Sequence, residues 1–357
     1  MLVKILPLLM SPFILATLLF ALGLGTMITF ASSHWLLAWM GLEINTLAIL
    51  PLMAQHHHPR AIEATTKYFI AQATAAAMLL FASATNAWLT GQWDIQLMTH
   101  PLPVTLITLA LALKMGLAPM HSWLPEVIQG VDFTTGLVLS TWQKLAPFVL
   151  LLQLQPTNST LLLALGTAST LVGGWGGLNQ TQLRKILAYS SIAHLGWMTI
   201  VLQFSPSLAL LTLIVYFTMT FSAFLMFKLN NSTNLNSLAI SWTKAPVATA
   251  LAPLVLLSLG GLPPLTGFMS KWLILQELTK QDLMPLATLL ALSALLSLYF
   301  YLRLAYSLTL TVSPNTLIGT TPWRHPTSHL TLLLSTSTVA TVFLLPITPA
   351  IVTLFSL

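Results

Sequence analysis

Long apolar runs, separated by short polar or charged segments, follow one another along the whole chain. A membrane-spanning helix needs about 20 mostly apolar residues, and about eleven runs meet that requirement. They lie near residues 5–23, 26–52, 64–84, 103–123, 135–154, 159–178, 186–204, 208–229, 247–275, 284–308 and 330–355. The runs are continuous and rich in Leu, Ala and Met, whereas strands of a membrane β-barrel alternate over segments of about ten residues. The pattern predicts an all-α polytopic membrane protein, and counts between about ten and twelve fit it.

The composition excludes most other classes of protein. Charged residues make up 6% of the 357 positions, against roughly 25% in a soluble domain, so a soluble chain would expose large apolar patches. The 56% of hydrophobic residues also excludes intrinsic disorder. The absence of Cys excludes disulfides, thiolate zinc sites and a self-contained iron–sulfur cluster. Basic residues are spread singly, so nucleic acid is not an expected partner.

Basic residues outside the apolar runs predict the orientation. If the predicted helices alternate, one side of the membrane receives Lys280 alone. The other side receives Lys4, Arg60, Lys67, Arg184, Lys185, Lys228, Lys244 and Arg324. The N-terminus should therefore face the negative compartment and the C-terminus the opposite one. No segment combines the features of a removed signal peptide, so none is expected.

Four ionisable residues fall near the middle of predicted spans: Glu43, Lys114, Lys144 and Lys271. Each costs roughly 2.5–3.5 kcal/mol at the centre of a membrane helix. One Glu–Lys salt bridge could be purely structural, but a single acid cannot pair with all three lysines. Burial favours the neutral amine and a nearby carboxylate favours the ammonium, so a buried Lys with a movable partner can load and release a proton. This chemistry predicts a proton relay, and a metal site is not expected because ammonium is a poor ligand.

Two predicted spans are interrupted by Gly and Pro. One contains LALKMGLAPMHSWLP around Lys114, and the other contains LGGLPPLTGFMSKW before and at Lys271. Interrupted helices at matching positions of two halves indicate an ion pathway, although each alone could be an ordinary proline kink. The two spans are an odd number of helices apart, which predicts inverted repeats. The expected parts are 1–155 and 156–308 as two five-helix repeats, and 309–357 as a C-terminal loop and last helix.

Weaker signals surround these residues. His121 and His194 could carry protons between the lysines, because His titrates near neutrality, or they could be hydrogen-bonded core residues. The glycine-rich run 173–177 lacks the strand–turn–helix context of a dinucleotide site. Close packing of helices explains that run better.

Several long segments resemble a known family. They are WMGLEINTLAILPL, HHPRAIEATTKYFI, LKMGLAPMHSWLPEVIQG, STWQKLAPF, LRKILAYSSIAHLGWM and GGLPPLTGFMSKW. Over nearly its whole length the chain resembles the antiporter-like membrane subunits of mitochondrial NADH:ubiquinone oxidoreductase (respiratory complex I), in a vertebrate-like form. Related subunits usually have Glu where this chain has Lys271, which favours the subunit 2 branch.

The resemblance implies antiporter-like inverted repeats and proton translocation across the inner mitochondrial membrane, driven by quinone reduction elsewhere in the enzyme complex. It implies that other subunits bind NADH, FMN, iron–sulfur clusters and ubiquinone, and that this chain holds no cofactor. The implied partners are other membrane-arm subunits and the bilayer, with cardiolipin as a candidate lipid. The N-terminus would then lie on the matrix side. Two alternatives remain, a freestanding cation/proton antiporter and a structural subunit without conduction.

The resemblance also implies a role for each buried residue. Glu43 and Lys114 would form an adjustable pair, and Lys144 would be the central station, with Ser140, Thr141 and Gln143 as polar neighbours that hold water.

Lys271 would be the terminal station on the second interrupted helix, with hydroxyls of Thr266 and Ser270 beside it. The alternative for Lys271 is a lysine that extends to the lipid headgroups and anchors the helix end together with Trp272.

Overall fold

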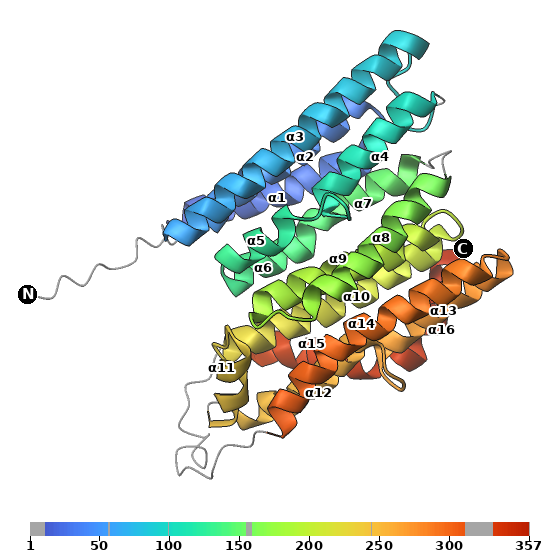
Figure 1. Cartoon of the computed structure of the whole chain (residues 1–357). Coiled ribbons are helices and arrows are strands. Elements are labelled where there is room, and N and C mark those ends of the chain that lie inside the picture. Colours follow the sequence, from blue (N-terminus) through green and yellow to red (C-terminus); the bar gives the residue numbers. More distant parts are fainter. Residues whose placement is uncertain are drawn as a thin grey trace, which may run out of the picture. The chain divides into compact units, whose positions relative to one another are not determined.

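The computed structural model describes residues 11–55, 58–98, 100–154, 159–243, 245–310 and 331–356. Within these ranges the secondary structure is helical, with two isolated β-bridges and no named strand (Figure 1). The predicted all-α class is therefore confirmed. Residues 5–10 of the first predicted span, together with Lys4, Lys244 and Arg324, lie outside the described residues. The chain divides into two compact units, Met1–Leu162 and Leu163–Leu357.

The first unit is built from the helices coloured from blue to green in Figure 1. They are α1 (Pro12–Ala31), α2 (Trp35–Met53), α3 (Pro59–Thr90), α4 (Pro101–Met115), α5 (Trp123–Gly130), α6 (Phe133–Ser140) and α7 (Trp142–Leu154). Helix α1 packs along α2, α3 packs on α2, α4 and α5, and α7 contacts α1, α2 and α4. The ionisable residues of α2, α4 and α7 are thereby gathered in one bundle.

The boundary between α1 and α2 differs from the prediction. The apolar run 26–52 was expected to be one span, but α1 continues to Ala31 and α2 begins at Trp35. The polar residues between them explain the break, because the His34 side chain accepts a hydrogen bond from the Leu36 N–H at 3.2 Å and caps α2. Helix α1 in turn starts late, at Pro12, after the Ser11 cap.

Proline and glycine mark many of the helix ends. Proline occupies the first turn of α1, α3, α4, α10, α12 and α14, where its missing N–H costs no helical hydrogen bond. Gly91, Gly116 and Gly261 follow α3, α4 and α12 with φ values of +71°, +79° and +81°. This left-handed conformation suits glycine and ends a helix abruptly. Two of these glycines stand at the predicted interruptions.

The second unit begins within α8 (Ser159–Gly177). It continues with α9 (Leu183–Val201), α10 (Pro206–Leu229), α11 (Leu235–Ala239), α12 (Pro246–Gly260), α13 (Thr266–Lys280), α14 (Met284–Thr309), α15 (Thr331–Phe343) and α16 (Thr348–Ser356). Helix α10 contacts α9, α12, α13 and α15, and α12 packs along α14. The broken pair α12–α13 therefore packs against α10 and α14.

The glycine-rich end of α8 packs closely against two helices. A Cβ on Gly173 would lie 2.6 Å from the backbone nitrogen of Ala193 in α9, and one on Gly177 would lie 2.8 Å from the Phe300 ring in α14. Gly176 is covered by the Tyr189 ring. The predicted packing role of residues 173–177 is confirmed, because a side chain at these positions would displace a neighbouring helix.

Length and composition identify fewer complete spans than predicted. Among the described residues six helices are long and apolar enough to cross a membrane, and α15 with α16, bent by 65°, would add a seventh. Helices α4 and α12 are apolar but short, with 15 residues each, because the interruptions end them. The polytopic membrane class is confirmed, whereas the count of eleven is not.

Candidate functional site

The first interruption lies between α4 and α5. Gly116 N–H and Leu117 N–H both donate to the Ala112 carbonyl, at 2.9 Å each, and close the end of α4. Two side chains donate hydrogen bonds to carbonyls of the same last turn. Trp123 Nε1–H donates to the Leu113 oxygen at 3.1 Å, and Gln72 Nε2–H donates to the Lys114 oxygen at 3.3 Å. Neutral donors therefore satisfy carbonyls of the broken helix, and none of these bonds uses the Lys114 amine.

Lys114 and Glu43 are brought into the same region of the first unit. The Lys114 side chain is 6% exposed, and its Nζ has no hydrogen-bond partner among the described residues. One carboxylate oxygen of Glu43, Oε2, is likewise buried without a partner there. The Glu43 carboxylate is close enough to interact electrostatically with Lys114 and with the buried Tyr68 hydroxyl. The two groups can therefore influence each other's charge without a fixed hydrogen bond.

Lys144 lies in the first turn of α7, just after the break that separates α6 from α7 at Thr141. It is 2% exposed. The hydroxyls of Ser140 and Thr141 both donate to the Leu137 carbonyl of their own helix, at 3.0 and 2.7 Å. Gln143 instead reaches across to α2, where its Nε2–H donates to the Asn45 carbonyl at 3.2 Å. Among these three neighbours, Gln143 connects Lys144 with the Glu43 helix.

A small cavity of about 10 Å³ joins the two buried lysines of the first unit. Its lining includes Lys114, Lys144, Asn45, Gln72 and Gln143. About 10–15 Å³ is the least volume that can hold one water molecule. The lining is partly apolar, but it also supplies amine and amide groups, which can form hydrogen bonds. The fold thus leaves a partly polar space between α4 and α7 with room for at most a single water.

The second interruption, between α12 and α13, holds Lys271. Gly261 and Leu262 N–H groups donate to the Leu257 carbonyl at 3.1 and 3.2 Å. Lys271 Nζ turns back to the break and donates to the Gly260 carbonyl at 2.8 Å. The ammonium therefore lies at the C-terminal end of α12, where the helix dipole favours a positive charge. Trp272, next to it in the sequence, is 54% exposed, so the two side chains do not share one environment.

The hydroxyls expected beside Lys271 make bonds of their own. Thr266 Oγ1–H donates to the Thr341 carbonyl of α15 at 2.7 Å, and Ser270 Oγ–H to the Gly267 carbonyl at 3.0 Å. Thr266 thereby ties the start of α13 to α15, while Ser270 bonds within its own helix. Both are buried, at 1% and 8% exposure.

The two candidate histidines occupy different settings. His121 lies in the segment between α4 and α5, with Nδ1 3.2 Å from the Pro119 carbonyl oxygen. His194 lies on α9, and its ring is 5.5 Å from that of Tyr216 on α10. His121 lies in the same unit as Lys114 and Lys144, and His194 lies in the same unit as Lys271.

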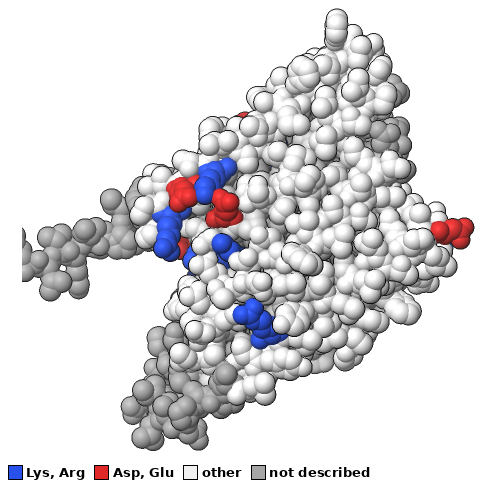
Figure 2. Space-filling model, viewed as in Figure 1, with Lys and Arg blue, Asp and Glu red and all other residues white. Residues whose placement is uncertain are grey.

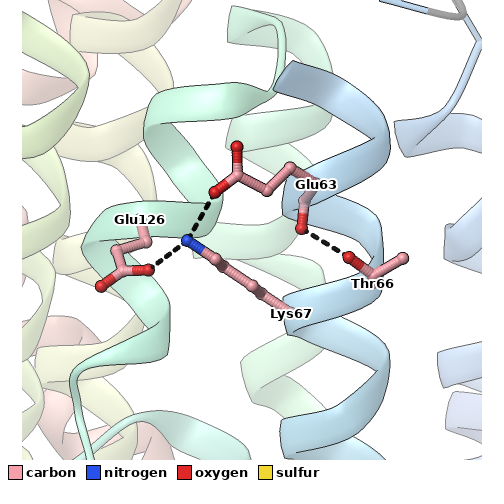
Figure 3. Close-up of polar contacts among 4 residues, drawn as sticks. All are labelled: Glu63, Thr66, Lys67 and Glu126. Atoms are coloured by element: carbon pink, nitrogen blue, oxygen red, sulfur yellow. Dashed lines mark hydrogen bonds and ion pairs between the residues drawn. The ribbon is translucent and has the colours of Figure 1, made fainter. Parts of the chain in front are cut away.

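An exposed group of charges lies at the start of α3 (Figure 3). Lys67 Nζ is 2.7 Å from a carboxylate oxygen of Glu63 and 2.7 Å from one of Glu126 on α5. These side chains are 42% to 63% exposed. On the face drawn in Figure 2, charged residues occupy a few small groups and leave most of the surface uncharged. The pair of Lys67 with Glu126 thus joins α3 to α5 at the surface, whereas the pair with Glu63 lies within α3. The sequence patterns did not point to either pair.

Sequence reasoning also missed two amide side chains of the cavity. Asn45 stands two positions after Glu43, and Gln72 lies in α3; they are 2% and 4% exposed. The signal that would have found them is the one used for the lysines, a polar residue in the middle of an apolar helix. A neutral amide costs less to bury than a charge, so its signal in the sequence is weaker than that of the lysines.

Family models match almost the whole chain. Residues 32–297 match the family described as NADH:quinone oxidoreductase/Mrp antiporter, transmembrane region. Residues 298–352 match the family described as NADH dehydrogenase subunit 2 C-terminus. The two matches follow one another without a gap and include all six candidate residues, from Glu43 to Lys271.

Individual proteins are similar over comparable lengths. NADH-ubiquinone oxidoreductase chain 2 from Tetraodon nigroviridis is 73% identical over 348 residues, which cover 98% of this chain and 100% of the relative. A chain of respiratory complex I from Thermus thermophilus is 27% identical, with a TM-score of 0.79 over 94% of this chain and 80% of that one.

A more distant structure is similar in fold alone. It is a chain of an archaeal membrane-bound sulfane sulfur reductase, with 17% identity, a TM-score of 0.83, and coverage of 99% of this chain and 77% of that one.

Proposed function

We propose that a relay of buried residues carries protons through this chain. The chain belongs to the family of NADH-ubiquinone oxidoreductase chain 2. It is a multi-pass protein of the inner mitochondrial membrane and a proton-translocating subunit of the membrane arm of respiratory complex I. The full-length match to such subunits disfavours a freestanding cation/proton antiporter. The relay consists of Glu43, Lys114, Lys144 and Lys271, and quinone reduction elsewhere in the complex drives it.

The observation that carries the relay is the shared cavity of Lys114 and Lys144. Two lysines in one apolar bundle repel each other when both are charged, so a single shared proton is the favourable state. A proton leaving the Lys114 ammonium through one water would convert the Lys144 amine to an ammonium and leave Lys114 neutral. The reverse step restores the starting state, so the pair can alternate without a net change of charge.

Glu43 sets the direction of this exchange in the proposal. Its carboxylate acts on Lys114 from α2, and an approach of that carboxylate favours the proton on Lys114. A retreat favours release toward Lys144. A movement of α2 against α4 would thus protonate and deprotonate Lys114. A conformational change driven by quinone reduction could act on the relay through this movement.

Lys271 is the terminal station of the second unit in this proposal. Its amine faces the broken end of α12, which supports an interior role over a headgroup anchor. His121 and His194 are secondary candidates for carrying protons between the lysines. NADH, FMN, iron–sulfur clusters and ubiquinone are assigned to other subunits, and this chain is proposed to bind no cofactor.

The proposed orientation places the N-terminus on the matrix side and the C-terminus on the intermembrane side. The basic residues Arg60, Lys67, Arg184, Lys185 and Lys228 support it through the positive-inside rule. The proposed partners are other membrane-arm subunits and bilayer lipid, with cardiolipin as a candidate.

Substitution of Lys144 in the assembled complex tests the relay. Lys144→Met should preserve assembly but lower NADH-driven proton pumping by at least about tenfold, since a positioned proton-transfer group typically contributes about a hundredfold or more. Lys144→Arg should also impair pumping, because Arg stays protonated in proteins. Proton uptake into sealed vesicles and quinone reduction are measured together. Full pumping by the Arg variant would refute proton exchange at this position, and full pumping by the Met variant would refute the relay.

A further inference from the structure

The side-chain amide of Asn45 is buried without a partner in the first unit. Asn45 is 2% exposed, and neither Nδ2 nor Oδ1 has a hydrogen-bond partner among the described residues. An amide offers two donors and two acceptor positions, and leaving them all unused in an apolar interior is costly. The position therefore requires a polar group that is small enough to reach it.

Two neighbouring helices contact Asn45. Gln143 of α7 donates a hydrogen bond from its side-chain amide to the backbone carbonyl of Asn45. Gly25 of α1 makes room for the amide, since a Cβ there would overlap Oδ1 and would lie 2.8 Å from the Gly41 carbonyl. The Asn45 amide therefore packs against α1 where residue 25 has no side chain.

The cavity described above meets this requirement. Asn45 lines it together with Lys114 and Lys144, and the Lys114 Nζ is a second buried polar atom without a partner among the described residues. The volume of about 10 Å³ is about that needed by one water, which requires two to four polar partners. An amide can both donate to and accept from such a water, whereas an ammonium only donates.

We infer that Asn45 is a positioning residue that holds a bridging water between Lys114 and Lys144. The inference rests on the proposed relay and adds a residue to it. The Asn45 amide orients the water so that one lone pair accepts a proton from Lys114 while an O–H points toward Lys144. The proton leaves the lysine nitrogen as the water delivers another to the second nitrogen, so no charge remains on the water.

Asn45→Leu in the assembled complex is the primary test. Leu has nearly the shape of Asn but no polar atom, so it fits beside Gly25 and cannot hold the water. We expect proton pumping to fall by at least about tenfold, with quinone reduction falling in parallel. Asn45→Ser restores a hydroxyl and should recover part of the pumping, which a purely structural role would not predict because Ser fills less space.

A matched control uses a second buried asparagine. Asn86 of α3 is 0% exposed, donates to the Gln92 carbonyl at 3.0 Å and does not line the cavity. Asn86→Leu should keep the wild-type rate of proton pumping. If it lowers that rate as strongly as Asn45→Leu does, the effect is not specific to the cavity and the inference is wrong.

Two further measurements separate this inference from the relay. If Lys144→Met abolishes pumping while Asn45→Leu pumps normally, the relay stands and the role of Asn45 is refuted. If Lys144→Met pumps normally, the relay itself fails. A map of the assembled complex that resolves waters decides independently of activity, even if Asn45→Leu does not assemble. We expect a water within hydrogen-bond distance of the Asn45 amide and a lysine Nζ, and a direct bond from the amide to a protein group would overturn the inference.

Discussion

The two interruptions, α4–α5 in the first unit and α12–α13 in the second, have the same pattern of backbone hydrogen bonds. They differ in where a lysine stands and in what its amine binds. Each follows a 15-residue apolar helix that begins at a proline. In each, a left-handed glycine and the next residue donate to the same carbonyl of the last turn. Each also contains a cis X–Pro bond, Ala118–Pro119 or Pro263–Pro264. The backbone solution is therefore the same, within each unit considered alone.

The ionisable residues stand on opposite sides of these two glycines. Lys114 precedes Gly116, and the residue at the same spacing before Gly261 is Leu259. Lys271 follows Gly261, and the residue at the same spacing after Gly116 is Glu126. Lys114 is buried and its amine is without a hydrogen-bond partner in the described part of the chain, whereas Lys271 bonds the Gly260 carbonyl and Glu126 bonds Lys67 at the surface.

This difference shows that a helix break and a proton carrier are separate requirements. At the first break neutral donors from Gln72 and Trp123 satisfy the carbonyls, so the Lys114 amine is left for proton exchange. At the second break the Lys271 amine itself supplies a donor. Lys271 therefore has a structural task as well as its proposed task in the relay, and Lys114 has only the latter.

The largest expected effect comes from replacing each lysine by Met. Both Lys114→Met and Lys271→Met should lower proton pumping by at least about tenfold. Lys271→Met should in addition destabilise its unit by about 1–3 kcal/mol, because the Gly260 carbonyl loses its donor in a buried site. Thermal inactivation and the yield of assembled complex, measured beside pumping, separate the two effects.

Lys280→Met is the matched control for these variants, because Lys280 is exposed and contacts only Glu277 in the hydrogen bonds and ion pairs of the structure's described part. It should change neither pumping nor stability. Equal losses of stability in Lys114→Met and Lys271→Met would remove the distinction between the two breaks.

A smaller effect is expected from adding a methyl group at the glycines. Gly116→Ala and Gly261→Ala each force an L-residue into the left-handed region, at about 1–2 kcal/mol. At Gly261 the new Cβ would also lie 2.9 Å from the Lys271 Cδ and 3.0 Å from its Nζ, whereas at Gly116 the nearest atom is a Leu124 methyl at 3.2 Å. Gly261→Ala should therefore be the more destabilising and should displace the Lys271 amine.

Gly91→Ala is the control, since Gly91 has the same left-handed φ and nothing within 4 Å of a Cβ. It reports the backbone strain alone in a thermal unfolding measurement. A Gly261→Ala variant no less stable than Gly91→Ala would show that the contact between Lys271 and the break contributes little.

The smallest effect is expected at Glu126, the counterpart of Lys271. Glu126→Gln weakens an exposed ion pair with Lys67, and such pairs contribute about 0–1 kcal/mol. Pumping should remain near the wild-type rate in the vesicle assay. Glu277→Gln, which removes an ion pair with Lys280 instead, is the comparison variant. If Glu126→Gln lowered pumping and Glu277→Gln did not, each of the two breaks would be followed by a functional ionisable residue. The proposed difference between the breaks would then be wrong.

The class of protein and the residues worth testing could be predicted from the amino-acid sequence. Continuous apolar runs require helices in a membrane, because lipid cannot satisfy open backbone groups. The cost of burying charge singles out Glu43 and three lysines, and Gly and Pro at 116–125 and 260–267 predict where α4 and α12 end. These signals are local, since each depends on a residue and its neighbours along the chain.

Which of these groups lie next to one another could not be predicted from the sequence, because it depends on how the helices pack. The cavity of Lys114 and Lys144 combines side chains from α2, α3, α4 and α7, and no spacing in the sequence shows that Asn45 faces it. The bond of Lys271 to Gly260 and that of Gln72 to the Lys114 carbonyl depend in the same way on how helices pack. One local prediction was also wrong. The apolar run 26–52 was expected to be a single span, but α1 ends at Ala31 and α2 begins after the cap at His34. Hydropathy reports burial but carries no direction around the helix, so partners across helices follow from packing alone.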